Sequence, residues 1–113
     1  MIINGTDIHM IRGDTEQLTI SCRTADGQSR PFVSGDKVQL TVAWRSGGEP
    51  VLAKTIEDFT PDGTAVILLS HTDTNLLQAT EYRYDVQLTA VDGAVVTIIP
   101  PSKFVVEGDV TRD

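Results

Sequence analysis

The side chains that could perform chemistry are few in this sequence and lie far apart. The two histidines, His9 and His71, have no second histidine or cysteine near them, although Asp73 follows His71 closely. A protein zinc site needs at least three protein ligands, so this spacing predicts solvated loop histidines rather than a metal centre. Cys22 is the only cysteine, which excludes an intramolecular disulfide and a multi-cysteine zinc site. By strand alternation, Cys22 is expected to be a small buried apolar residue.

No arrangement of residues predicts an enzyme. The sequence contains neither a Gly-x-Ser-x-Gly nucleophile motif nor a glycine-rich phosphate loop ahead of a helix. Glu57 and Asp58 are neighbours in a predicted turn, whereas acid–base work by paired carboxylates needs the two groups to face each other across a cleft. We therefore expect no catalytic residue, no cofactor and no bound metal.

Arg12-Gly13-Asp14 matches the tripeptide of integrin ligands. Glycine and aspartate are also common turn residues, and the tripeptide stands between two predicted strands. The sequence therefore predicts a turn here. The three Asp-Gly pairs are too dispersed to form a calcium site, and turn chemistry accounts for all of them.

Charge and hydropathy exclude several classes of partner. Sixteen acidic and nine basic side chains give a formal net charge of −7, and the basic residues are scattered along the chain. An acidic surface repels phosphates, so nucleic acid is not expected as a partner. No apolar run is long enough to span a bilayer and no secretory signal is visible at the start, so we expect no membrane association and synthesis in a cytoplasm.

Period-two alternation interrupted by turn residues about every ten positions dominates the sequence. This pattern is typical of a β-sandwich or barrel, and no amphipathic helix of useful length is present. We predict one domain over residues 1–113: an all-β, immunoglobulin-like antiparallel β-sandwich of seven to nine short strands with no long helix. The predicted strands cover about 8–12, 17–22, 37–44, 51–57, 64–70, 81–90, 94–99 and 103–107, and one helical turn falls within 72–77.

Two aromatic residues favour the immunoglobulin type of sandwich, and a third limits the resemblance. Tyr82 opens the penultimate long strand, where a tyrosine corner places a hydroxyl against upstream backbone. Trp44, near the end of the third strand, is expected to face inward by alternation. Tyr84 occupies the position that a second cysteine would take in antibody domains, so the resemblance is one of architecture only.

Two strands are apolar on both faces, which a sandwich strand does not need. Val66 and Leu68 oppose the core-facing residues of 64–69, and Val96 and Ile98 are the corresponding residues of 94–99. On one sheet, these four residues would form a contiguous apolar patch of the kind that marks a protein contact. The alternative is that loops or the terminal strand cover this second face.

An ordered set of turn-plus-strand motifs extends over nearly the whole chain. It consists of Arg12-Gly13-Asp14-Thr15, Asp26-Gly27, Gly35-Asp36-x-Val38-x-Leu40-Thr41-Val42, Asp73-Thr74-x-x-Leu77, Tyr82-x-Tyr84-Asp85-Val86-Gln87-Leu88, Asp92-Gly93-x-x-x-Thr97-Ile98 and Asp109-Val110-Thr111. The order resembles small phage and prophage tail-region proteins. It is also similar to the immunoglobulin-like N-terminal domain of phage baseplate upper proteins.

The resemblance implies a non-enzymatic structural protein of a phage or prophage tail or baseplate, made in the bacterial cytoplasm and incorporated into the virion. Its partners would be itself, as a homo-oligomer, or other tail and baseplate proteins. No cofactor is implied. Because the chain ends soon after the sandwich, a scaffold or adaptor role is expected rather than direct host recognition. A module that binds carbohydrate or a cell-surface ligand through its loops is the alternative, although such sites usually present aromatic platforms and this chain is only 5% aromatic.

Overall fold

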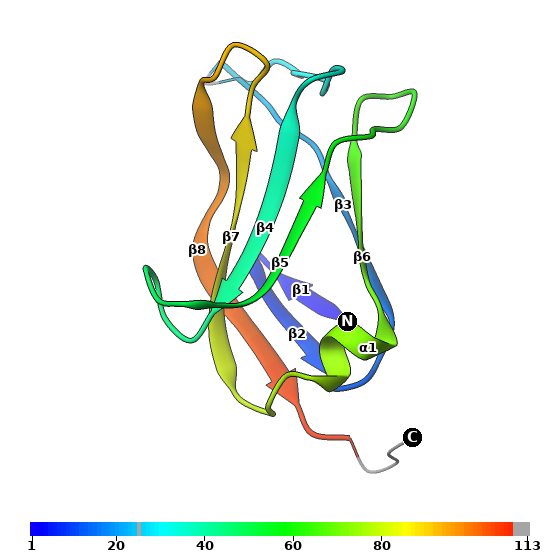
Figure 1. Cartoon of the computed structure of the whole chain (residues 1–113), viewed down its shortest axis with the longest axis vertical. Helices are drawn as coiled ribbons and strands as arrows, with labels where there is room; N and C mark the ends of the chain where they lie inside the picture. The colour runs from blue at the N-terminus through cyan, green and yellow to red at the C-terminus, as the bar shows by residue number, and fades with distance from the viewer. Residues whose placement is uncertain (25, 110–113) are drawn as a thin grey trace.

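The computed structural model describes residues 1–24 and 26–109, and over Ile2–Asn4 it describes the backbone only. In this part of the chain the fold is all-β, with strands in two layers and one short helix (Figure 1). The elements are β1 (Ile2–Asn4), β2 (Asp7–Ile11), β3 (Glu16–Ile20), β4 (Lys37–Ala43), β5 (Pro50–Ile56), β6 (Ala65–Leu69), α1 (His71–Asn75), β7 (Glu81–Thr89) and β8 (Val95–Glu107). The predicted fold class is confirmed.

The two layers differ in size. The larger sheet has the strand order β1-β2-β8-β7-β4-β5, and the smaller one pairs β3 with β6. β5 is the last strand of the larger sheet, and Pro50 at its start is tolerated there because an edge strand needs no amide donor on its outer side. β2 and β8 pair in parallel, from Ile8↔Phe104 to Ile11↔Glu107, whereas the other strand pairs are antiparallel. This departure from the antiparallel expectation arises because β2 and β8 are far apart in the sequence, so no tight hairpin fixes their direction.

The core lies between the sheets and follows the alternation in the sequence. Val38, Leu40 and Val42 of β4 are fully buried, and they face the fully buried Ala65, Ile67 and Leu69 of β6 across the sandwich. The inward residues of β7 are buried as well. Burial stabilises such side chains by roughly 1.5–3 kcal/mol each for Val, Leu or Ile, which supports the fold without a disulfide.

The Asp-Gly turns adopt the backbone conformation that their composition predicts. Gly27, Gly63 and Gly93 have φ of 85°, 77° and 91°, a region that favours glycine. Gly63 also allows close contact, since a Cβ there would lie 2.4 Å from the Cβ of Pro31. The Phe32 amide donates to the Gly63 carbonyl at 2.9 Å, so this turn is attached to the neighbouring loop.

β8 corrects one sequence prediction. Pro100 and Pro101 were expected to end a strand at 99 and leave a separate one over 103–107, but β8 is continuous from Val95 to Glu107. The register with β7 shifts between Tyr84 and Val86 and again between Val86 and Gln87. These irregularities give β8 extra residues, and prolines are tolerated at such bulges because an amide there need not join the ladder.

The sandwich has two distinct ends (Figure 1). We call the end with the connections 21–36, 57–64 and 90–94 the Asp36 end, and the end with 12–15, 44–49 and 70–80 the Trp44 end. Arg12-Gly13-Asp14 forms the expected turn at the Trp44 end, where the Asp14 amide donates to the Ile11 carbonyl at 3.1 Å. Helix α1 begins with a capping box between Ser70 and Asp73.

Candidate functional site

The four residues predicted to form one apolar interface lie on different sheets. Val66 and Leu68 are on the outer face of β6, where Leu68 is 52% exposed, whereas Val96 and Ile98 belong to β8 of the larger sheet. Val96 is 45% exposed, and Ile98 packs partly against the core. A single contiguous patch is therefore wrong, because strand pairing assigned these two strands to opposite layers.

Trp44 is also a correction. Its side chain was expected to face inward, but it is 50% exposed. β4 ends at Ala43, where its register with β5 shifts, so Trp44 lies beyond the part of the sheet that the second layer covers. Its ring packs against Tyr82 with centroids 4.8 Å apart. The chain therefore presents one large aromatic surface at the Trp44 end.

Tyr82 forms the predicted tyrosine corner. Its hydroxyl accepts from the Gln78 amide at 2.8 Å and donates to the Gln78 carbonyl at 3.2 Å. The side chain is 2% exposed, so these bonds satisfy a buried polar group. The corner fixes the chain between α1 and β7.

Tyr84 connects the larger sheet to the β1–β2 turn. Its buried hydroxyl donates to the Thr6 carbonyl, and its ring meets Phe104 edge-on with centroids 5.8 Å apart. Burial, reinforced by the nearby charge of Asp7, raises the pKa of Tyr84 to about 12. Tyr82 and Tyr84 thus each join their strand to a neighbouring loop through a buried hydroxyl.

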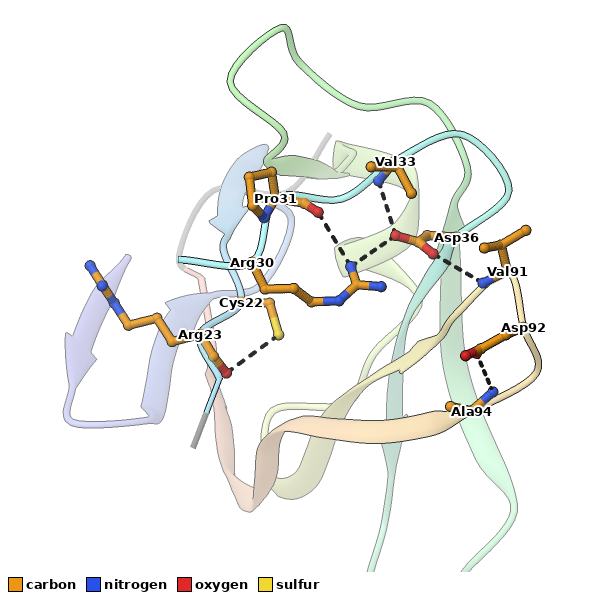
Figure 2. Close-up of polar contacts among 9 residues, drawn as sticks. All are labelled: Cys22, Arg23, Arg30, Pro31, Val33, Asp36, Val91, Asp92 and Ala94. Atoms are coloured by element: carbon orange, nitrogen blue, oxygen red, sulfur yellow. Dashed lines mark hydrogen bonds and ion pairs between the residues drawn. The ribbon is translucent and has the colours of Figure 1, made fainter. Parts of the chain in front are cut away.

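A buried carboxylate organises the Asp36 end (Figure 2). The Asp36 side chain is fully buried, and the Arg30 guanidinium donates to its Oδ2 at 2.9 Å. The same Oδ2 accepts from the Val33 amide at 2.9 Å, and Oδ1 accepts from the Val91 amide at 3.1 Å. One side chain thus joins the 30–36 loop to the 90–94 hairpin.

Electrostatics favours the ionised form of this carboxyl. The hydrogen bond from Arg30 holds the pKa of Asp36 below its ordinary value, and the two backbone amides act in the same direction against desolvation. The same bond to Asp36 raises the pKa of Arg30. The carboxylate with its three donors is therefore a charged, satisfied structural element at neutral pH.

Exposed valines surround this buried pair. Val33 is 52% exposed and Val91 is 67% exposed, although the backbone amide of each is held by Asp36. Gly35, with φ of 97°, lies beneath Val91, where a Cβ would come within 2.8 Å of a valine methyl. Val95, 61% exposed, lies on the outer face of the same hairpin opposite Thr89, whereas Val96, opposite the buried Leu88, is on the other face of β8. Rigid backbone and exposed apolar side chains together are typical of a contact surface.

The adjoining half of β8 has a free edge. β2 pairs with β8 only over Phe104–Glu107, so Val95–Ile99 is paired with β7 alone. No backbone hydrogen bond joins this edge to another segment within residues 1–24 and 26–109. A free edge of this kind can accept an additional strand.

The direction of the free amides follows from the hairpin. The Ala90 amide donates to the Ala94 carbonyl at 2.8 Å, so the backbone N–H of Ala90 points toward β8. Hydrogen-bonded and non-hydrogen-bonded pairs alternate along an antiparallel ladder. Val95, opposite Thr89, and Thr97, opposite Gln87, therefore direct their backbone groups away from β7 toward the free edge.

The residues considered in the sequence for metal binding or catalysis do not come together at one site. His71 contacts the Gly13 carbonyl through Nδ1 at 2.5 Å, and Cys22 is buried as expected. Among the described residues, no group of three or more His, Cys, Asp or Glu side chains could hold a metal ion. Glu57 forms an exposed ion pair with Lys37 at 3.7 Å. The best-ordered candidate site is therefore the group of exposed side chains Val33, Val91 and Val95, which we call the valine surface, together with the free edge of β8.

Asp36 is the residue that sequence reasoning missed. In the sequence, Asp36 stands only in a turn-plus-strand motif before β4. The one available signal is Arg30, an arginine six positions upstream that could pair with it. That spacing is a weak signal, because nothing in it shows that both side chains turn toward the same loop. The 90–94 hairpin, which supplies the third donor, is distant in sequence.

No helix in the described part of the chain is sufficiently long and apolar to cross a membrane. In comparison with known proteins, no model of a protein family matches this sequence, and no curated protein was found to be similar to it.

Proposed function

We propose that this chain is a non-enzymatic, immunoglobulin-like structural module that acts by protein–protein assembly in a phage or prophage tail or baseplate. The observation that carries the assembly role is the free edge at Val95–Ile99 beside the exposed valines of the Asp36 end. The tail or baseplate setting rests on the resemblance of the turn-and-strand motifs. Synthesis in the bacterial cytoplasm and incorporation into the virion belong to the same proposal.

A second copy of the chain is the partner that this edge fits. Antiparallel pairing about Thr97 would place Thr97 opposite its own counterpart and Val95 opposite Ile99. A Thr–Thr cross-strand pair contributes roughly 0.2–1 kcal/mol relative to an alanine pair, and Val and Ile suit the pleated surface on either side of it. The backbone groups of Val95 and Thr97 already point outward, so pairing leaves the bonds to β7 intact.

Charge also favours this contact over other parts of the surface. The net charge of −7 makes copies repel each other, whereas residues 94–102 contain no charged side chain. Pairing this segment with itself therefore opposes no like charges. Pro100 and Pro101 limit its length, which gives a defined pair rather than an extended fibre.

The test is mass in solution by light scattering over a concentration series, with Thr97→Pro and Val95→Lys as variants. Thr97→Pro removes an amide that points away from β7, so the fold should be retained while pairing weakens. Leu68→Lys is the matched control, because Leu68 is similarly exposed but lies on the smaller sheet. We expect a dimer in the wild type and in the control and a monomer in both edge variants.

A wild type that stays monomeric at millimolar concentration would contradict assembly through this edge. Loss of the dimer in Leu68→Lys alone would instead locate the contact on β6. The tail assignment has its own test, since mass spectrometry of purified particles from a lysogen encoding this chain should detect it. Its absence from the particles would overturn a virion role.

A carbohydrate or cell-surface binding module is the second candidate, and the exposure of Trp44 favours it. A half-exposed indole is the kind of aromatic platform that such sites use, and its position against Tyr82 fixes the ring. A glycan array probed with the wild type and Trp44→Ala tests this role. Binding lost in the variant supports it, and no binding by the wild type contradicts it.

A further inference from the structure

A shallow groove of about 250 Å³ lies on the outer face of the larger sheet, toward the Trp44 end. Its polar lining comes from Thr41 of β4, from Arg83, Asp85 and Gln87 of β7, and from Arg45 in the turn after β4. Neither the exposed valines nor any residue of Val95–Ile99 lines the groove, although Gln87 of its lining is paired with Thr97 of the free edge. The groove is therefore a second feature of the same sheet.

The groove contains cations that lack partners. Most Lys and Arg side chains in the described ranges have a specific role: Arg30, Lys37 and Lys54 form ion pairs. Arg12 and Arg23 donate to the carbonyls of Asn75 and Gly27. The remaining described cations are Arg45, Arg83 and Lys103, and their side chains make no hydrogen bond or ion pair with any described residue.

These three cations share one region because of the strand register. Arg83 is directly opposite Lys103 on one side and Ala43, the last residue of β4, on the other, and Arg45 in the following turn lines the same groove as Arg83. Directly opposed like charges destabilise a sheet. The repulsion between Arg83 and Lys103 is a local cost in a chain with an excess of acidic residues.

The turn after β4 holds Arg45 over the groove. The Gly48 amide donates to the Arg45 carbonyl at 3.0 Å, which closes the turn. A Cβ on Gly48 would come within 3.1 Å of both the Arg45 Cγ and its carbonyl oxygen. Glycine at this position therefore leaves space for the arginine stem beside the turn.

Two carboxylates limit what the groove can accept. Asp85 is part of the lining, and Glu81 is on the same face of β7 at the opposite side of Arg83. Neither forms an ion pair with Arg45, Arg83 or Lys103. A small anion that reaches two guanidinium groups is therefore favoured over a broad polyanion, which Asp85 and Glu81 would repel.

We propose that this groove binds an oxyanion, the phosphate or carboxylate group of a small ligand, between Arg45 and Arg83. Guanidinium groups match both kinds of oxyanion through paired N–H···O bonds. Lys103 adds a point charge beside Arg83, and Thr41 and Gln87 are neutral hydrogen-bonding groups for the rest of the ligand. The bound anion would offset the repulsion between Arg83 and Lys103.

The test is an NMR titration of backbone amides at low ionic strength with sodium pyrophosphate and, separately, sodium malonate. We expect saturable shifts confined to the groove, at Thr41, Gln87 and the 46–48 turn. The stronger of the two probes identifies the phosphate or the carboxylate as the ligand group. Arg83→Gln should weaken binding about tenfold or more, since a charge-assisted hydrogen bond contributes that much.

Arg23→Gln is the control, because Arg23 is an exposed arginine at the opposite end of the molecule. The proposal is overturned if neither probe gives saturable shifts, or if Arg83→Gln and Arg23→Gln weaken binding equally, which would indicate general charge screening. It is also overturned if the amides of Thr41 and of the 46–48 turn, which are not adjacent to the free edge of β8, shift on simple concentration without added anion. That result would show acidic groups of a second copy at the groove.

Discussion

The two ends of the sandwich use charge in different ways. At the Asp36 end, a fully buried carboxylate is paired with Arg30, and the exposed Val33 and Val91 lie on the backbone that it holds. At the Trp44 end, neutral hydrogen bonds from Tyr82 fix the chain, and the nearby Arg45 and Arg83 are unpaired. One end pairs a buried charge beneath exposed valines, and the other leaves two arginines unpaired near a half-exposed tryptophan.

The difference indicates that a buried ion pair and an exposed cation have different consequences for binding. Asp36 makes the 30–36 loop and the 90–94 hairpin one unit, so Val33 and Val91 are exposed on a fixed backbone. A preorganised apolar surface loses little conformational entropy when a partner binds. Unpaired arginines at the other end remain available to an anion.

The largest effect is expected from Asp36→Ala. This change removes the acceptor of two backbone amides and leaves Arg30 without its partner, which should lower the free energy of unfolding by about 3 kcal/mol. Chemical denaturation measures it. Glu57→Ala is the matched control at the same end, because its ion pair with Lys37 is exposed and should contribute less than about 1 kcal/mol.

Acid should weaken the same contacts of the Asp36 carboxylate with Arg30 and the two backbone amides. Because the folded-state pKa of Asp36 lies below its ordinary value of 3.8, its contribution is complete above that value and is lost as the pH falls through the lowered pKa. In Asp36→Ala this part of the acid dependence should be missing. Equal pH dependence of the two proteins below pH 4 would show that the pair does not couple folding to protonation.

A smaller effect is expected from Tyr82→Phe at the other end. Loss of the hydroxyl leaves the Gln78 amide and carbonyl without this partner, which should lower the free energy of unfolding by about 2 kcal/mol. The comparison between the ends predicts that Tyr82→Phe broadens the amide signals of the 76–80 segment and not those of 90–94. Broadening at both ends would mean that the two ends are not independent.

The smallest effect concerns Tyr84 at alkaline pH. Its folded-state pKa, about 12, is above the ordinary value of 10.0, so stability is complete below pH 10 and falls as the pH rises toward 12. At pH 11 the loss should be about 1 kcal/mol. Tyr84→Phe should remove this loss, and an unchanged alkaline slope in that variant would assign it to other groups.

The sequence was sufficient where neighbours along the chain decide the structure. Alternation in β4 and β7 predicted the buried faces, and the Asp-Gly pairs predicted turns with positive φ at the glycine. The tyrosine corner also follows from local order, because Gln78 and Tyr82 are separated by only four positions. These features depend on side-chain period and turn conformation, which are properties of short segments.

Strand assignment and surface exposure needed the tertiary structure. β6 and β8 have the same two-sided apolar pattern, but only pairing shows that they belong to different sheets. Trp44 continues the alternation of β4, yet its exposure depends on where the second layer ends. The sequence thus determined the all-β fold and its turns. Only the tertiary structure decided the contact of Asp36 with the 90–94 hairpin, the free edge of β8 and the arginine groove. Each of these features depends on segments that are distant in the chain.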